Sequence, residues 1–183
     1  MIEPAAGILL IAEPFLKDPN FMRTVVLLCD HQTDGSFGFV INRHYEHTLN
    51  ELMNDMDELP LPVFYGGPVQ MDTIHFLHQY PDKIPGSQEV QKGIYWGGDF
   101  EIAITLLQNG GIDKSKIRFF IGYSGWSDGQ LTNELKDKSW LTVEANRNIV
   151  FHKEAEEIWK ESLKLLGGDY EQLVNYPIDP QLN

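Results

Sequence analysis

The chain has 183 residues, of which 42% are hydrophobic and 22% are charged, so a globular protein with a sizeable core is expected. Its 27 acidic and 14 basic residues give a formal net charge of −13, which repels the phosphate backbone and disfavours direct DNA binding. The lone cysteine, Cys29, excludes an intrachain disulfide, and the lack of a signal peptide or an apolar run of about 18 residues predicts a cytoplasmic protein with no membrane partner.

The first third of the chain predicts buried strands joined by polar turns. Gly7–Ala12 and Thr24–Cys29 are short and continuously apolar, which is typical of strands buried on both faces. An Asp-Pro-Asn turn at residues 18–20 separates them. Phe39–Asn42 predicts a third strand after a reversal at Asp34, and we expect the second and third strands to form a hairpin with a longer loop.

The middle of the chain predicts short strands between two helices. Thr48 and Glu51 have the spacing of a capping box, which places the N-terminus of a helix there. Asp99 is the predicted N-cap of a second helix, whose apolar stripe begins at Phe100 and ends at Leu107. The predicted strands of this region are Val63–Tyr65 and Ile74–Leu77.

The segment that follows predicts a strand that turns sharply into a helix. Ile117–Ile121 is an apolar run, and the glycine-framed sequence Gly122–Trp126 comes after it as a corner. Helix N-termini present free N–H groups, so ligands often bind at such corners. The helix start is predicted from two pairs of residues, the capping box of Ser127 and Gln130 and the hydrophobic staple of Trp126 and Leu131.

The last part of the chain predicts one strand and one long helix. Trp140–Val143 is apolar, and Lys153–Leu166 combines an apolar face with an acidic start and a basic end that suit the helix dipole. Because no linker-like stretch divides the chain, we expect a single domain over residues 1–183.

Residue types that hold metals and nucleotides are present without the spacing that these groups need. Cys29 and His31 fall on the same face of a strand, but neither a second cysteine nor a close histidine pair completes a zinc site. His75 and His78 are three residues apart and therefore face opposite sides of a strand. The chain also lacks a P-loop and a dinucleotide-binding motif. We therefore expect no metal and no cofactor.

Ser124 lies in a sequence that matches part of the nucleophile elbow, Gly-x-Ser-x-Gly. Gly122 fits the motif, whereas Trp126 stands where the motif requires a small glycine. A serine hydrolase would also need a histidine, such as His75 or His152, within hydrogen-bond reach of the Ser124 hydroxyl. The simpler interpretation is a serine that satisfies the local backbone of a turn, so no catalytic residue is assigned.

Several segments, taken together and in order, form a specific pattern. They are Gly7–Pro14, Asp18–His31, Gly38–Arg43, Tyr65–Val69, Gly122–Trp126, and the pairs Gln130-Leu131 and Glu134-Leu135. In this order they resemble the YqgE/AlgH family of bacterial proteins over nearly the whole chain. The resemblance implies an α+β fold in which a branched mixed β-sheet is partly closed into a barrel and surrounded by helices. It carries over no reaction, and although one branch of the family is described as a regulator, this acidic chain has no helix-turn-helix motif.

The matched positions are rich in glycines, amides and aromatic rings and poor in acid/base pairs. Our main hypothesis is therefore a non-catalytic ligand- or protein-binding regulatory protein, and the alternative is a serine hydrolase that uses Ser124. The predicted binding groove is lined by Asn20, Arg23, Asn42, Arg43, Tyr123, Ser124 and Trp126. An arginine beside a buried strand can instead be a surface group or the partner of a carboxylate. The expected partner is a protein or a small molecule, and the acidic surface could dock a basic protein.

Overall fold

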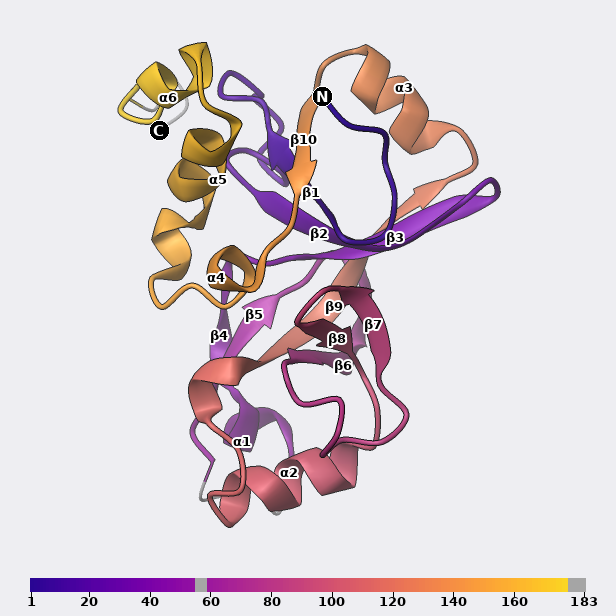
Figure 1. Cartoon of the computed structure of the whole chain (residues 1–183), viewed down its shortest axis with the longest axis vertical. Helices are drawn as coiled ribbons and strands as arrows, with labels where there is room; N and C mark the ends of the chain where they lie inside the picture. Colours follow the sequence, from indigo (N-terminus) through magenta and orange to yellow (C-terminus); the bar gives the residue numbers. More distant parts are fainter. Residues whose placement is uncertain (55–58, 178–183) are drawn as a thin grey trace.

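The computed structural model describes residues 1–54 and 59–177, and the ten strands of this part belong to one mixed sheet (Figure 1). The strands are β1 (Ile8–Ala12), β2 (Val25–Gln32), β3 (Gly35–Val40), β4 (His44–Thr48), β5 (Pro62–Tyr65), β6 (Val69–His78), β7 (Gln88–Gln91), β8 (Ile94–Trp96), β9 (Ile117–Ser127) and β10 (Trp140–Glu144). The α-helices are α1 (Leu49–Leu52), α2 (Phe100–Gln108), α3 (Gln130–Lys136), α4 (Arg147–Val150), α5 (Ile158–Leu166) and α6 (Asp169–Leu173). The predicted α+β fold with a branched mixed sheet and surrounding helices is confirmed.

The sheet curls into a half-barrel that stays open. Its strand order is β10-β1-β2-β3-β9-β6-β8-β7, with β5 attached to β4 and β9 outside this path. The strand at one end, β7, returns toward the start of β1, where Nε2 of Gln91 donates a hydrogen bond to the Gly7 carbonyl (3.4 Å). The barrel is thus only partly closed, as predicted, and strands from both ends of the sheet surround one core.

The sheet branches along β9, which is shared by three neighbouring strands. One edge of β9 pairs antiparallel with β6. The other edge pairs first with β5, in parallel, over residues 119–121 and then with β3, antiparallel, from Ser124 onward. Gly66 lies where β9 changes its partner from β5 to β3. Its N–H donates a hydrogen bond to the Ile121 carbonyl, and its own carbonyl accepts one from the N–H of Val40 (both 2.9 Å).

The branch replaces the corner expected at Gly122–Trp126, and that prediction is wrong. The strand does not end at Ile121 but continues to Ser127, because its backbone stays paired with β3 and β6. Gly122 has φ of +68°, and a Cβ atom there would lie 2.3 Å from the carbonyl oxygen of Gly67. The glycines therefore allow two strands to approach β9 closely rather than turning the chain.

The helix after β9 begins later than predicted. Its N-cap is Gly129, in the left-handed conformation, and not Ser127. Half of the expected capping box still forms, since the Gln130 side-chain oxygen accepts a hydrogen bond from the Ser127 N–H (3.1 Å). Trp126 and Leu131 are both buried in one hydrophobic cluster, as the staple prediction requires.

The hairpin of β2 and β3 is confirmed, but its loop is short. Pairing continues to Gln32 opposite Gly35, which leaves only Thr33 and Asp34 as loop residues. The third strand accordingly starts at Gly35 and ends before Asn42, which was predicted to lie within it.

The predicted N-cap positions of the first two helices are confirmed, but the capping box expected at Thr48 does not form, because the Thr48 side chain accepts no hydrogen bond from the helix backbone. The last helix is shorter than expected. Thr48 precedes α1, and Asp99 precedes α2, where its carboxylate accepts a hydrogen bond from the Ile102 N–H (3.1 Å). The predicted helix Lys153–Leu166 becomes α-helical only in α5, after a 3-10 turn at Ala155–Glu157. None of the helices in the described residues is long and apolar enough to span a membrane.

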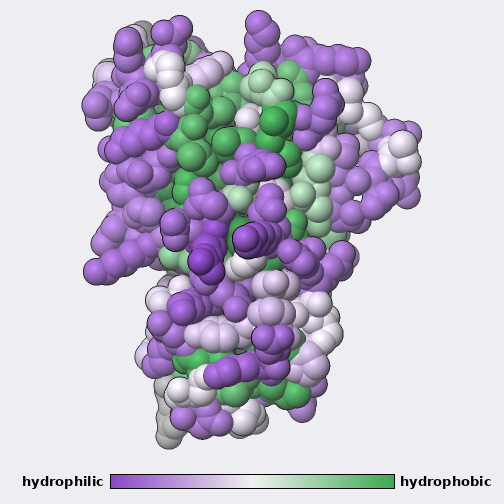
Figure 2. Space-filling model, viewed as in Figure 1, coloured by the Kyte–Doolittle hydropathy of each residue, from purple (hydrophilic) through white to green (hydrophobic). Residues whose placement is uncertain are grey.

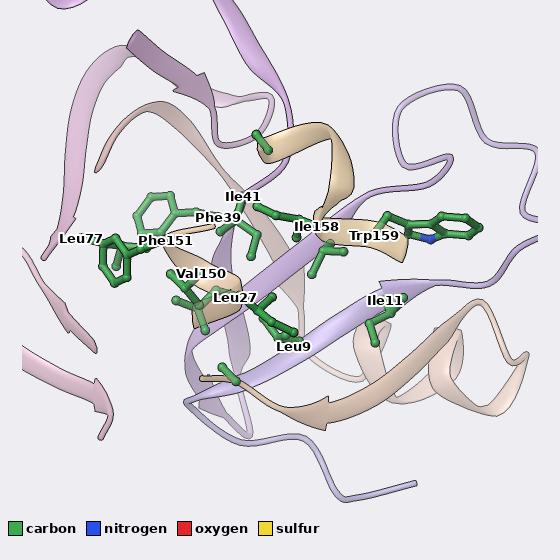
Figure 3. Packing of buried hydrophobic residues seen from close by; sticks show 14 of the residues in the cluster. Leu9, Ile11, Leu27, Phe39, Ile41, Leu77, Val150, Phe151, Ile158 and Trp159 are labelled. Carbon is green, nitrogen blue, oxygen red and sulfur yellow. The ribbon is translucent and has the colours of Figure 1, made fainter. Parts of the chain in front are cut away.

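The predicted burial of β1 on both faces is confirmed by the hydrophobic clusters on its two sides. Leu9 and Ile11 belong to a cluster that α4 and α5 cover, which Figure 3 shows from close by. Leu10 and Ala12 face the opposite cluster, beneath α3. In Figure 2, the upper half of the molecule shows hydrophobic residues between flanks of hydrophilic ones, where Figure 1 places β1, β2 and β10.

Candidate functional site

Arg43, a predicted groove residue, braces the turn that precedes β2. Its guanidinium donates hydrogen bonds to the carbonyls of Asn20 (2.7 Å), Pro19 (3.2 Å) and Met22 (3.3 Å). Burial lowers the pKa of Arg43, and the neighbouring Tyr65 and Asp18 partly oppose this effect. These contacts stabilise the turn, and Asn20 contributes its main chain to them.

Asn42 and Arg23 lie beside the turn that Arg43 holds, and they connect it to β2 and to the C-terminal helices. The Asn42 side chain accepts a hydrogen bond from the Val25 N–H and donates one to the Arg23 carbonyl (both 2.9 Å). The Arg23 guanidinium lies 4.8 Å from the ring centre of Trp159 and donates to the Tyr176 carbonyl (2.6 Å). The structure thus brings four of the predicted residues together, through contacts within the chain.

Ser124 is buried and has a structural partner. Its side chain is 1% exposed, and its hydroxyl donates a hydrogen bond to the Gly66 carbonyl (3.1 Å) across the branch of the sheet. Of the two candidate histidines, His75 lies 3.3 Å from the Thr73 hydroxyl and His152 accepts from the Glu154 N–H. The described residues therefore offer no hydrogen-bonded histidine that could activate this serine.

Tyr123, also predicted, lines a cavity of about 570 Å³ between the β2–β3 hairpin and strands β6, β8 and β9. Trp126 borders the cavity too, but its indole is buried in the cluster beneath α3, where Nε1 donates a hydrogen bond to Glu134 (2.8 Å). Three further aromatic side chains line the cavity with Tyr123, namely Phe37, His75 and Trp96. The rings meet at steep angles, with Phe37 at 76° to Tyr123 (5.9 Å between centres) and His75 at 89° to Tyr123 (6.1 Å). We call this site the acidic aromatic cavity, because its remaining lining includes Asp30 and Asp34.

The charges of the acidic aromatic cavity all have one sign. Among the described residues that line it, Asp30 and Asp34 are the ionisable groups that are charged at neutral pH, since no Lys or Arg belongs to the lining. Gln32 donates a hydrogen bond to one carboxylate oxygen of Asp30 (2.9 Å) and leaves the other available. Burial lowers the pKa of His75, which keeps its imidazole neutral. The site therefore offers aromatic faces and negative charge to a ligand.

We expect the free energy of unfolding to fall as the pH is lowered below about 6.5. Burial lowers the pKa values of His75 and His78 from the ordinary 6.5, and a hydrogen bond to the Gly97 carbonyl partly opposes this at His78. The unfolded chain then binds protons first, so stability present above pH 6.5 is lost as the pH falls toward the folded-state pKa values. Urea unfolding at about pH 7.5 and about pH 5.5 measures the loss of unfolding free energy between these two pH values. This loss should be smaller in His75→Gln than in the wild type. Equal differences in both proteins would contradict this assignment to His75.

Metal chemistry finds no support in the described residues, which contain no group of three His, Cys, Asp or Glu side chains arranged to hold an ion. The Cys29 thiol is buried, and burial, assisted by the charge of Asp30, raises its pKa above the ordinary value. Cys29 therefore remains a protonated core residue at neutral pH rather than a ligand or nucleophile.

Proteins of similar sequence match this chain over nearly its whole length. A protein of Chlorobium luteolum called UPF0301 protein is 45% identical over 179 residues, which cover 98% of this chain and 95% of the relative. A UPF0301 protein of Cytophaga hutchinsonii is 43% identical over 178 residues, which cover 97% of this chain and 98% of the relative.

Two solved structures share the fold. The solution structure of the AlgH protein from Pseudomonas aeruginosa superimposes with a TM-score of 0.75 at 29% identity, over 98% of this chain and all of the other. A crystal structure of a Corynebacterium diphtheriae protein gives a TM-score of 0.78 at 18% identity, over 96% of this chain and 94% of the other, which shows the fold alone. The family model described as AlgH-like matches residues 9–171. This chain therefore belongs to the AlgH-like family.

Proposed function

We propose that this chain is a non-catalytic cytoplasmic binding protein, and that its acidic aromatic cavity holds the cationic group of a small molecule or of a partner protein. The observation that carries the proposal is the combination of aromatic rings with carboxylates as the charged groups of one cavity. A regulatory role would follow from this binding, with no DNA or membrane contact required.

The chemistry of the cavity suits an alkylammonium or guanidinium group. A cation over an aromatic face gains about 0.5–2 kcal/mol, more when it is removed from water. Asp30 and Asp34 add attraction, and neutral His75 adds no repulsion. The cavity volume of about 570 Å³ lies within the range of roughly 300–1,000 Å³ that is usual for small-molecule sites.

The contacts of Ser124 favour binding over hydrolysis. An acyl-transfer site needs an exposed nucleophile with a histidine at its hydroxyl. Ser124 is buried, and its hydroxyl bonds a main-chain carbonyl of the branch. We therefore do not propose the serine hydrolase.

Titration of the ¹⁵N-labelled protein with choline tests the proposal. We expect shifts of the Trp96 indole and Gly125 amide signals, which report on two residues of the cavity lining. The neutral analogue 3,3-dimethylbutan-1-ol should bind roughly 5- to 30-fold more weakly, which corresponds to about 1–2 kcal/mol for the charge. A peptide with a single trimethyllysine distinguishes a protein partner from a small molecule, because contacts beyond the cation would then tighten binding.

Two charge-neutralising variants provide the matched comparison. Asp34→Asn removes an exposed carboxylate from the cavity, and Glu101→Gln removes one from the exposed face of α2. Only Asp34→Asn should weaken choline binding. The proposal fails if choline and its neutral analogue bind equally well, or if the two variants behave alike.

A further inference from the structure

A second cavity, of about 910 Å³, gathers basic side chains in an otherwise acidic chain. It lies between β4 and β5, the 3-10 turn Lys114–Lys116 with the start of β9, and α4 with the residues that follow it. Five of the chain's 14 Lys and Arg residues line it, namely Lys114, Lys116, Arg118, Arg147 and Lys153. No Asp or Glu belongs to its lining in the described part of the chain. We call it the basic cavity; Figure 2 shows strongly hydrophilic residues at the level where Figure 1 places α4.

Arg118 is the best-positioned group of the basic cavity. β9 holds its guanidinium 4.7 Å from the ring centre of Phe64, and Nη2 donates to the His152 carbonyl. Nη1 is the one buried side-chain nitrogen or oxygen of the described residues without a hydrogen-bond partner. Burial lowers the pKa of Arg118 to about 10, so the group stays charged at neutral pH. A buried charged donor without an acceptor is unfavourable, and an anion in the cavity would satisfy it.

None of the five cations of the basic cavity forms an ion pair within the described part of the chain, although the charge of Lys116 contributes to the lowered pKa of Asp113, for which hydrogen bonds from Ser115 are the main cause. An exposed carboxylate, Glu156, lies nearby without lining the cavity. Hydrogen bonds within its own turn are the main cause of its lowered pKa, and His44 and His152 of the cavity add to the effect.

We propose that the basic cavity binds a small molecule that carries phosphate groups, which Arg118 and the surrounding lysines contact through their N–H donors. Guanidinium and ammonium groups are the side chains that bind phosphate oxygens best. The cations come from two segments of the chain, Lys114, Lys116 and Arg118 from the first and Arg147 and Lys153 from the second. This arrangement suits more than one anionic group. Phe64 and Phe151 offer apolar surface to the remainder of the ligand.

The overall charge of the chain favours a small anion over a polymer. A net charge of −13 repels a nucleic acid whose backbone extends beyond the cavity. A compact anion can instead fit within the cavity, whose lining in the described residues includes five cations and no carboxylate. Attraction at such short range is screened less by salt than attraction beyond the Debye length of about 8 Å.

Isothermal titration at constant ionic strength with pyrophosphate and with ADP tests the proposal. We expect both to bind, and a tighter ADP complex would show that the organic part contacts the apolar wall, whereas equal affinities would assign recognition to the phosphates alone. A single-stranded oligonucleotide should bind more weakly than pyrophosphate. The opposite order, or no heat from either phosphate compound up to millimolar concentration, would overturn the proposal.

Two triple variants with the same change in net charge separate the site from general electrostatics. Lys114→Gln, Lys116→Gln and Lys153→Gln remove three exposed cations of the basic cavity. The control combines Lys17→Gln, Lys92→Gln and Lys136→Gln, which are exposed lysines outside its lining. We expect at least about a tenfold loss of pyrophosphate affinity in the first variant and little change in the second. Equal losses in both would refute a specific site, and because all six positions are exposed, both variants should fold.

Discussion

Gly67→Ala is expected to destabilise the protein by at least about 4 kcal/mol, which places it among the most damaging single substitutions. A Cβ atom at Gly67 would lie 2.2 Å from the carbonyl carbon and oxygen of Tyr123 and 2.4 Å from the main-chain nitrogen of Ser124. The φ angle of Gly67, +152°, is also one that residues with a side chain rarely adopt. Relief would require β9 to move away from the residues that follow β5, which would open the branch of the sheet.

Gly110→Ala is the matched control for this prediction. Gly110 also has a positive φ, +74°, but no atom beyond its two chain neighbours lies within 4 Å of the position that its Cβ would take. Only the strain of the left-handed conformation remains there, which costs about 1–2 kcal/mol. Urea unfolding of the two variants therefore separates steric conflict from backbone strain. Similar losses at the two positions would show that the branch tolerates a wider separation.

Phe39→Ala should cost about 3–5 kcal/mol of unfolding free energy and should also weaken choline binding. Phe39 is fully buried in β3 and stacks on Phe120, with 5.2 Å between ring centres and 25° between planes. It also packs against His75 (5.2 Å) and Phe37 (6.1 Å), two aromatic residues of the acidic aromatic cavity. Loss of this ring would leave a void directly beneath the proposed binding surface.

Phe39→Leu is the control, because it keeps most of the buried apolar volume and should lose much less stability than the alanine variant. Urea unfolding measures the first effect, and choline titration under conditions in which each variant is folded measures the second. A loss below about 1 kcal/mol for Phe39→Ala would mean that the core around the cavity collapses without cost.

The elements that were predicted well are those whose signals are local. The continuous apolar run of β1 indicated a strand buried on both faces, and Asp99 indicated a helix N-terminus. The branch was not predicted, because glycines that allow a close approach of strands look like glycines that turn a chain. Only the pairing of β9 with β3 and β5 distinguishes the two cases at Gly122.

The candidate sites were also predicted only in part, because residues from distant strands form them. Tyr123 and Trp126 were among the predicted binding residues, but Phe37, His75 and Trp96 come from three other strands, and no spacing along the chain brings them together. Arg118 had a usable signal that the sequence analysis missed. A single charged residue within the apolar run Ile117–Ile121 must find a partner or a cavity when the strand is buried.

The position of β1 in the sheet has a consequence for the synthesis of the chain. β1 pairs on one edge with β10, where Ala12 lies opposite Trp140, a residue that follows it by 128 positions. At ribosomal rates of about 5–20 residues per second, that edge stays without its partner for roughly 6–26 s after β1 has been made. The nascent chain thus carries an unpaired apolar strand edge through most of its translation, which is the kind of segment that chaperones shield from other nascent chains.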